Sequence, residues 1–241
     1  MEDFSNLTLA EIVNKNFLAA TVFEKYNLDF CCRGNRQLKE VCMTNNLPLE
    51  TIIEELKIIG QSNNSDLAYE QLSFTQLADY IVLTHHEYIK NAMPVLYRYL
   101  LKVATKHAAI FPELKKIFQI FVAIKKEMEI HLHQEETVLF PGIKKLEASP
   151  PGEKNNAVAD DSFLETPIHL LEEEHNHAEN FFEEIKELTN NYSPLSTACT
   201  MHKLCFSMLQ SFEKDLEQHT HLENNILFPK ALKLLGLSHS G

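Results

Sequence analysis

Apolar residues recur every three or four positions along most of the chain, whereas strict alternation of apolar and polar residues, the pattern of a half-buried β-strand, is scarce. The three-to-four period is typical of amphipathic α-helices, and it predicts long helices near residues 73–105, 112–146, 167–190 and 194–235. The second helix is expected to bend where Pro141-Gly142 interrupts it. Long helices joined by turns favour an all-α fold with an up-and-down four-helix bundle.

A group of short helices is predicted before the bundle. Thr8 and Glu11 have the spacing of a capping box and predict a helix that reaches about Tyr26, while Pro48 suits the first turn of a later helix. The polar run that follows has the composition of a linker. We therefore expect a small N-terminal helical domain at residues 1–60, a linker at 61–72 and the four-helix bundle at 73–241.

The apolar stripe of each long helix also contains polar residues. Side chains spaced by threes and fours share one face of a helix, and this face is the one that packs into a bundle core. Histidines and glutamates occupy such positions on all the long helices and are expected to point inwards: His86, His131, Glu135, His175, His219 and Glu223.

An internal repeat relates two of these helices. His131 and Glu135 are followed by Leu-Phe-Pro at 139–141, and His219 and Glu223 are followed by the same three residues at 227–229. The bundle is therefore expected to consist of two similar helical hairpins, each with one lone histidine and one His-x-x-x-Glu pair. Such symmetry suits a site for two metal ions.

A metal centre explains these residues better than a packed core does. A single histidine on an apolar stripe is more often a hydrogen-bonded core residue, but a buried carboxylate without a counter-charge costs several kcal/mol. Metal ions would neutralise both glutamates and use every stripe histidine. Imidazole and carboxylate ligands without thiolate suit iron, manganese or zinc. Two histidines per metal, with Glu135 and Glu223 as bridges, would leave positions open for a small ligand.

Three further carboxylates are candidates for hydrogen bonds to the ligand imidazoles or for proton relay: Glu127, Glu174 and Asp215. Glu127 and Asp215 each precede a stripe histidine by four residues, and Glu174 is next to one. A solvated acidic flank is the alternative interpretation.

The remaining histidines are not predicted to be ligands. His85, His133 and His221 fall beside the stripes and are expected to be surface or supporting residues. No comparable pattern includes His107, His169, His177, His202 or His239.

Cys31 and Cys32 are adjacent in a turn-like segment close to Arg33 and Arg36. Their Cα atoms are about 3.8 Å apart, below the usual disulfide minimum of about 4.4 Å, so a thiol pair or a transient redox couple is favoured over a structural bridge. The arginines could lower the thiol pKa values and favour redox or iron-transfer chemistry, and a buried structural pair is the alternative. The other cysteines, Cys42, Cys199 and Cys205, are interpreted as small apolar helix residues.

Composition narrows the class of protein. The 241 residues include 12 histidines and have a formal net charge of -12, which argues against a general binder of nucleic acid or anionic membrane. No apolar run has the length of a membrane span, and the start lacks the basic region of a signal peptide. Together with 5 cysteines in no disulfide pattern, this predicts a cytoplasmic protein.

The segment Tyr-Asn-Leu-Asp-Phe-Cys-Cys at 26–32, followed by a bundle with these histidines and glutamates, closely resembles the repair of iron centres family, of the ScdA/YtfE type. The resemblance extends over about residues 7–235. It implies an N-terminal domain that carries Cys31 and Cys32 and a hemerythrin-like bundle with two non-haem iron ions, which an oxo group could bridge. By this resemblance the ligand set is the four stripe histidines, with Glu135 and Glu223 as bridges.

The resemblance also implies a function. Members of the family are cytoplasmic stress-response homodimers that help to restore iron–sulfur clusters damaged by nitric oxide or oxidants. We therefore expect damaged iron–sulfur proteins as partners and nitric oxide or O2 as a small ligand, but no nucleic acid and no membrane. Two alternatives remain: a di-iron enzyme that reduces nitric oxide, and a hemerythrin-like sensor that binds O2 or nitric oxide without turnover.

Overall fold

The computed structural model describes residues 4–16, 19–30, 33–60, 69–148 and 162–235. The chain divides into two compact units, one of Met1–Leu77 with Thr220–Gly241 and one of Ala78–His219. Within the described ranges the regular elements are helices, and one isolated β-bridge joins Thr8 to Gln37. The all-α prediction is therefore confirmed. In the described ranges, no helix combines the length and the apolar character needed to cross a bilayer.

Short helices precede the bundle, at Phe4–Asn6 (η1), Leu9–Lys15 (α1), Ala19–Lys25 (α2), Leu38–Thr44 (α3) and Leu49–Gly60 (α4). Their apolar faces form one core around Phe23, Phe30 and Leu38. The predicted capping box is present, since the Thr8 hydroxyl accepts from the Glu11 amide and the Glu11 carboxylate accepts from the Thr8 amide. The single helix predicted up to Tyr26 is wrong, because the extended backbone of Asn16 ends α1.

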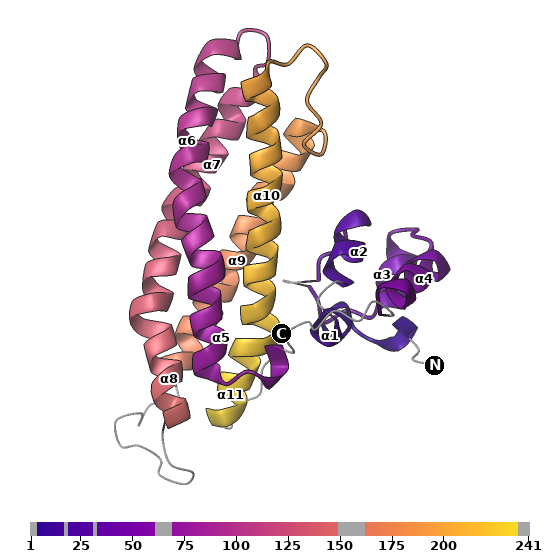
Figure 1. Cartoon of the computed structure of the whole chain (residues 1–241), viewed down its shortest axis with the longest axis vertical. Helices are drawn as coiled ribbons and strands as arrows, with labels where there is room; N and C mark the ends of the chain where they lie inside the picture. The colour runs from indigo at the N-terminus through magenta and orange to yellow at the C-terminus, as the bar shows by residue number, and fades with distance from the viewer. Residues whose placement is uncertain (1–3, 17–18, 31–32, 61–68, 149–161, 236–241) are drawn as a thin grey trace. The chain divides into compact units, whose positions relative to one another are not determined.

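The long helices are found near the predicted positions. They comprise Phe74–Ile81 (α5), Val82–His86 (η3) and Glu87–His107 (α6); Glu113–Gln134 (α7), Glu135–Leu139 (η4) and Phe140–Ala148 (α8); Ser162–Thr189 (α9); and Thr200–Leu222 (α10), Glu223–Leu227 (η5) and Phe228–Leu235 (α11). Figure 1 shows α6, α7, α9 and α10 running alongside one another. Buried side chains from all of these helices, among them Leu96, Phe121, Phe182 and Phe212, form their common core.

Two helix starts differ from the prediction. The third long helix begins at Ser162 rather than at Pro167, and its apolar stripe accordingly starts one turn earlier, with Leu164 buried like Ile168. The fourth begins at Thr200 rather than near Pro194. The chain between them turns through Tyr192, which has a φ of 56° and a buried side chain whose hydroxyl donates to Glu213. This contact with α10 belongs to the segment between α9 and α10, which is therefore a structured connection and not the first turns of α10.

Three of the long helices contain a π turn. In such a turn the amide of residue i+5 donates to the carbonyl of residue i, whereas in an α-helix the donor is the amide of residue i+4. In η4 the Phe140 amide donates to the Glu135 carbonyl, and in η5 the Phe228 amide donates to the Glu223 carbonyl. Pro141 and Pro229 follow directly. Proline has no N–H to donate to the carbonyl four residues earlier, and each of these prolines directly follows the phenylalanine whose amide closes the π turn. The helix continues through Pro141 as α8, and its irregularity at this point is the π turn of η4.

Gly34 is required by close packing in the N-terminal helices. A Cβ atom at this position would lie 2.3 Å from the Phe30 carbonyl oxygen and 3.0 Å from the Ala10 Cβ. Because both neighbours are held in the core, Gly34→Ala is expected to lower the free energy of unfolding by about 1–3 kcal/mol. Urea denaturation would measure this loss. Lys39→Ala, at an exposed helix position, should change stability by no more than about 0.5 kcal/mol; equal effects of the two changes would contradict the packing argument.

Candidate metal centre

The structure brings the six histidines and glutamates of the apolar stripes together. They form two groups, in each of which the ligand atoms lie within 4.8 Å of one another. The first group is His86, Glu135, His219 and Glu223, and the second is His131, Glu135, His175 and Glu223. All six side chains are buried, and five of them have no exposed surface. The helical period therefore placed every one of these residues on the inner face.

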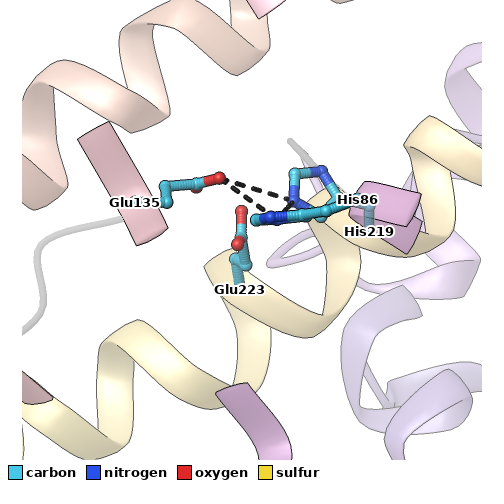
Figure 2. Close-up of side chains that lie close together, drawn as sticks. All are labelled: His86, Glu135, His219 and Glu223. Carbon is cyan, nitrogen blue, oxygen red and sulfur yellow. Dashed lines mark hydrogen bonds and ion pairs between the residues drawn. The ribbon is translucent and has the colours of Figure 1, made fainter. Parts of the chain in front are cut away.

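In the first group, the imidazoles of His86 and His219 face each other and the Glu135 carboxylate (Figure 2). Their Nε2 atoms are 3.1 Å apart. The Oε2 atom of Glu135 is 3.3 Å from Nε2 of His86 and 3.8 Å from Nε2 of His219. Glu223 lies one helical turn after His219, because α10 continues without a break into η5.

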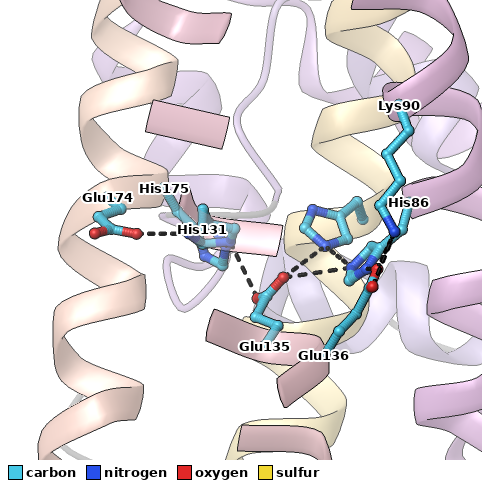
Figure 3. Close-up of polar contacts among 8 residues, drawn as sticks. His86, Lys90, His131, Glu135, Glu136, Glu174 and His175 are labelled. Atoms are coloured by element: carbon cyan, nitrogen blue, oxygen red, sulfur yellow. Dashed lines mark hydrogen bonds and ion pairs between the residues drawn. The ribbon is translucent and has the colours of Figure 1, made fainter. Parts of the chain in front are cut away.

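The second group has the same design. The Nε2 atoms of His131 and His175 are 3.0 Å apart, and Nε2 of His131 is 3.0 Å from Oε1 of Glu135 (Figure 3). The two carboxylate oxygens of Glu135 thus face different pairs of histidines. Glu135 is therefore shared by the two groups, and Glu223 belongs to both groups as well.

The distances and the donor atoms fit bound metal. Nitrogen and oxygen ligands about 2.0–2.2 Å from one ion lie roughly 3–3.8 Å from each other when the angle between them is about 90–120°, and the observed separations span the same range, from 3.0 to 3.8 Å. Burial, foremost, and the neighbouring imidazoles lower the pKa of His219 well below its ordinary value, although Glu135 acts in the opposite direction. A neutral imidazole keeps the lone pair that a metal needs.

The π turns coincide with the candidate ligands. η3 ends at His86, η4 begins at Glu135 and η5 begins at Glu223. Such turns are rare and are frequently found at functional sites. Phe140, the first residue after η4, stacks on the His86 imidazole with the ring centroids 5.6 Å apart. The η4 turn thus places Phe140 against the imidazole of His86.

Carboxylates hold the outer nitrogens of two ligand imidazoles. Nδ1 of His86 is 2.8 Å from Glu136, which also accepts hydrogen bonds from the Lys90 ammonium, and Nδ1 of His131 is 2.7 Å from Glu174 (Figure 3). Burial would raise the pKa of Glu136, but the hydrogen bonds from Lys90 and His86 outweigh it and the pKa is lowered. A carboxylate in this position fixes the orientation of the imidazole and leaves Nε2 to bind a metal.

The supporting carboxylates differ in part from those predicted. Glu174 does bond an imidazole, that of His131, so it takes the role that the sequence suggested for Glu127. Asp215 contacts His85, with 3.0 Å between Oδ1 and Nδ1, instead of His219. Glu136 was not predicted, because the repeat has Asn224 at the equivalent position. The signal that could have found it is Lys90, one turn after His86 and suited to pair with an acidic residue on a neighbouring helix.

The other histidines and the cysteines give a mixed outcome. The prediction for His85, His133 and His221 was a surface or a supporting position: His133 is exposed, whereas His85 and His221 are buried, and burial lowers the pKa of His221 to about 4. Cys42 and Cys205 are buried as predicted, whereas Cys199 is exposed and precedes α10. Cys31 and Cys32 lie outside the described residues, so their proposed chemistry remains a prediction.

Comparison with known proteins gives two family matches. Residues 77–231 match the model of the hemerythrin HHE cation binding domain, and residues 5–59 match the ScdA_N model, described as a domain of unknown function. The chain is 31% identical to the iron-sulfur cluster repair protein ScdA of Staphylococcus haemolyticus, over 92% of this chain and 96% of that protein. It is 33% identical to a probable iron-sulfur cluster repair protein of Haemophilus influenzae, over 95% and 98%. Identity to the iron-sulfur cluster repair protein YtfE of Shigella boydii is 32%, over 89% and 91%.

A double change should empty both groups of metal. His131→Ala with Glu135→Ala removes a histidine from one group and the shared carboxylate from both. Elemental analysis of chain purified from iron-rich medium is expected to show almost no iron, against about two ions for the unchanged protein if each group holds one. His133→Ala, an exposed neighbour on the same helix, is the control and should keep its iron. Retention of metal by the double variant would refute the assignment.

The contact of His131 with Glu174 gives a sharper test of the surrounding carboxylates. Glu174→Gln weakens the hydrogen bond that orients His131 and should lower iron affinity by about 10- to 100-fold, measured by competition with a chelator. Glu127→Gln is the matched comparison, because Glu127 lies four residues before His131 and no hydrogen bond joins the two among the described residues. An equal loss in both variants would show that general surface charge, and not this contact, is responsible.

Proposed function

The chain belongs to the hemerythrin HHE cation-binding family, and on this basis we propose that it is a di-iron protein that repairs iron–sulfur clusters damaged by nitrosative or oxidative stress. The observation that carries the proposal is the pair of four-residue groups that share Glu135 and Glu223. The names of the relatives supply the repair activity, and the likeness extends over most of the chain, including the N-terminal region.

Iron is the proposed metal. The donor set contains nitrogen and carboxylate oxygen without thiolate, which suits iron, manganese and zinc, and a repair factor for iron–sulfur clusters needs the first of these. When bound, the two iron ions would supply redox chemistry and positions for a small ligand. We assign His86 and His219 to one ion, His131 and His175 to the other, and Glu135 and Glu223 as bridges.

The proposed repair activity is donation of iron from this site to a damaged cluster. Glu136 and Glu174, which hold the outer nitrogens of His86 and His131, have side chains 27% and 35% exposed. Lys90, which pairs with Glu136, is 41% exposed. The carboxylates that orient two of the ligands are therefore partly exposed to solvent. A partner protein or a change in protonation could break their hydrogen bonds to the ligands. This supports a site that holds iron and also releases it.

Further parts of the proposal rest on the family alone. We expect Cys31 and Cys32 to take part in iron transfer or in redox exchange, the protein to work in the cytoplasm as a homodimer, and nitric oxide or O2 to act as the small ligand.

The second candidate function is reduction of nitric oxide at the same centre, with an external electron donor. One observation favours it: the candidate ligands are fully buried beside apolar groups such as Phe140, which stacks on His86. A small uncharged molecule enters such surroundings at much lower cost than a hydrated ion. A sensor that binds O2 or nitric oxide without turnover would use the same property.

The decisive experiment incubates iron-loaded chain with an iron–sulfur enzyme whose cluster has been damaged by nitric oxide. We expect enzyme activity to return in step with loss of iron from the chain. The double variant His131→Ala/Glu135→Ala should restore nothing, and the control His133→Ala should restore activity fully. Cys31→Ser with Cys32→Ser should retain iron and slow the recovery.

Each alternative has its own outcome in this experiment. Steady consumption of nitric oxide without recovered activity would identify the enzyme, and the repair proposal would then be wrong. A spectral change on binding nitric oxide or O2, with neither recovery nor consumption, would identify the sensor.

A further inference from the structure

The two hairpins of the bundle repeat the candidate ligands but not the charged residues beside them. His86 and His175 are equivalent in the repeat, as the lone histidine of each hairpin. Lys90 follows His86 by four residues, whereas Glu179 follows His175 by the same number. Side chains four residues apart are neighbours on one side of a helix. A cation therefore stands beside one histidine and a carboxylate beside the other.

The residue directly before each of these histidines differs too. It is His85 in the first hairpin and Glu174 in the second. Glu174 accepts a hydrogen bond from the His131 imidazole, so its negative charge lies beside the second group. Glu127 and Asp215 are also equivalent in the repeat, but both are acidic and do not distinguish the two groups. The repeat thus gives the second group more negative surroundings than the first.

The first group has one additional carboxylate, Glu136, and Lys90 neutralises it. The Lys90 ammonium donates to both oxygens of Glu136, at 2.6 and 2.9 Å, and Oε1 of Glu136 also lies 2.8 Å from Nδ1 of His86 (Figure 3). The Lys90–Glu136 pair therefore has no net charge. Glu174, by contrast, has no cationic partner among the described residues. His86 and His131 are bonded alike, but the charge behind them differs.

Lys90 is close enough to act on an ion held by His86. The contacts from its ammonium through Glu136 to the imidazole place it within about 8 Å of Nε2 of His86, less than the Debye length of about 10 Å in 0.1 M salt. At this separation one unit charge changes the affinity for a divalent cation on the order of 10-fold, with an effective dielectric constant between that of a protein surface and that of water. The change is a loss of affinity, because the ammonium and the metal ion have charges of the same sign.

Lys90 also has an opposite effect, because it holds Glu136 against His86. An exposed ion pair changes an equilibrium constant by at most about 5-fold, and the side chains of Lys90 and Glu136 are 41% and 27% exposed. Glu174 shows that a cation is not required for such a contact, since it bonds His131 at 2.7 Å without one. The repulsion between Lys90 and the ion therefore outweighs the support that Lys90 gives to Glu136.

We propose that Lys90 makes the ion of the first group, held by His86 and His219, the weaker bound of the two. This inference rests on the proposed di-iron function and deepens it, because it names the ion that is given up first to a damaged cluster. The second group, with its more acidic surroundings, retains its ion longer.

Competition with an iron(II) chelator tests the proposal on the full-length, iron(II)-loaded chain in the absence of oxygen. We expect iron to leave in two steps of one ion each, followed by the absorbance of the iron–chelator complex. Lys90→Met should strengthen the binding of the weaker-bound ion about 10-fold and leave that of the other unchanged. Lys90→Arg keeps the charge and should keep the weak step.

Two further variants assign the steps. Lys102→Met removes the same charge from an exposed position of α6 about 18 Å along the helix from Lys90, and it should change neither step. Glu174→Gln, which acts on the second group, should weaken only the tighter-bound ion. The difference between the unchanged chain and Lys90→Met should shrink when NaCl is raised from about 0.01 M to about 0.5 M, because salt screens the charge of Lys90.

The opposite results are equally specific. Weaker binding of one ion in Lys90→Met would show that the hold on Glu136 prevails, and the proposal would be wrong. Two ions of equal affinity in the unchanged chain, with no effect of Lys90→Met, would also overturn it and leave the di-iron centre intact. Failure of the unchanged chain to bind two iron ions would instead refute the proposed function on which the inference rests.

Discussion

Burial of two carboxylates inside a helical bundle is the constraint on which the rest of the structure depends. Glu135 and Glu223 have no exposed surface, and removal of a carboxylate from water costs several kcal/mol unless positive charge accompanies it. The residues around them are imidazoles, and burial lowers the pKa of His219 well below its ordinary value, which disfavours the positive charge that could compensate a carboxylate. A pair of divalent ions satisfies both requirements at once, because each ion takes nitrogen lone pairs and offsets carboxylate charge.

The helices are adapted to this centre in the backbone as well as in the side chains. The π turns begin at Glu135 and Glu223, directly after the ends of α7 and α10. A phenylalanine and a proline follow each turn. In the outer layer, Glu136 and Glu174 orient His86 and His131 through their Nδ1 atoms. His86 is therefore held by helix geometry, by stacking with Phe140 and by a hydrogen bond, and His131 by helix geometry and a hydrogen bond.

Features governed by local periodicity could be predicted from the sequence. Helical spacing decides which side chains face inwards, so His86 and Glu135 could be selected without knowledge of any neighbouring helix. The capping box at Thr8 depends on residues three apart and was equally accessible. Contacts between helices could not be predicted in this way. Glu136 bonds His86, and Asp215 bonds His85, and each pair is so far apart in the sequence that helical periodicity does not relate its two residues.

Backbone irregularities were the other failure of prediction. The sequence indicated a bend at Pro141-Gly142, but nothing in the helical period indicated the π turn of η4 that directly precedes Phe140 and Pro141. The connection before α10 similarly depends on Tyr192, whose buried contact with Glu213 has no local signature.

The π turns make the centre sensitive to chain length as well as to residue identity. A π turn holds one residue more than the α-helical path around it requires. Deletion of a single residue within Glu136–Leu139 would remove this extra residue and restore regular helix, which would change the directions of the side chains in the turn, among them Glu136 at Nδ1 of His86, although all six candidate ligands remained. Homologous sequences can thus keep every ligand and still differ in the hydrogen bonds that support the ligands, so an alignment of this family should count the residues between the glutamate and the Phe-Pro pair.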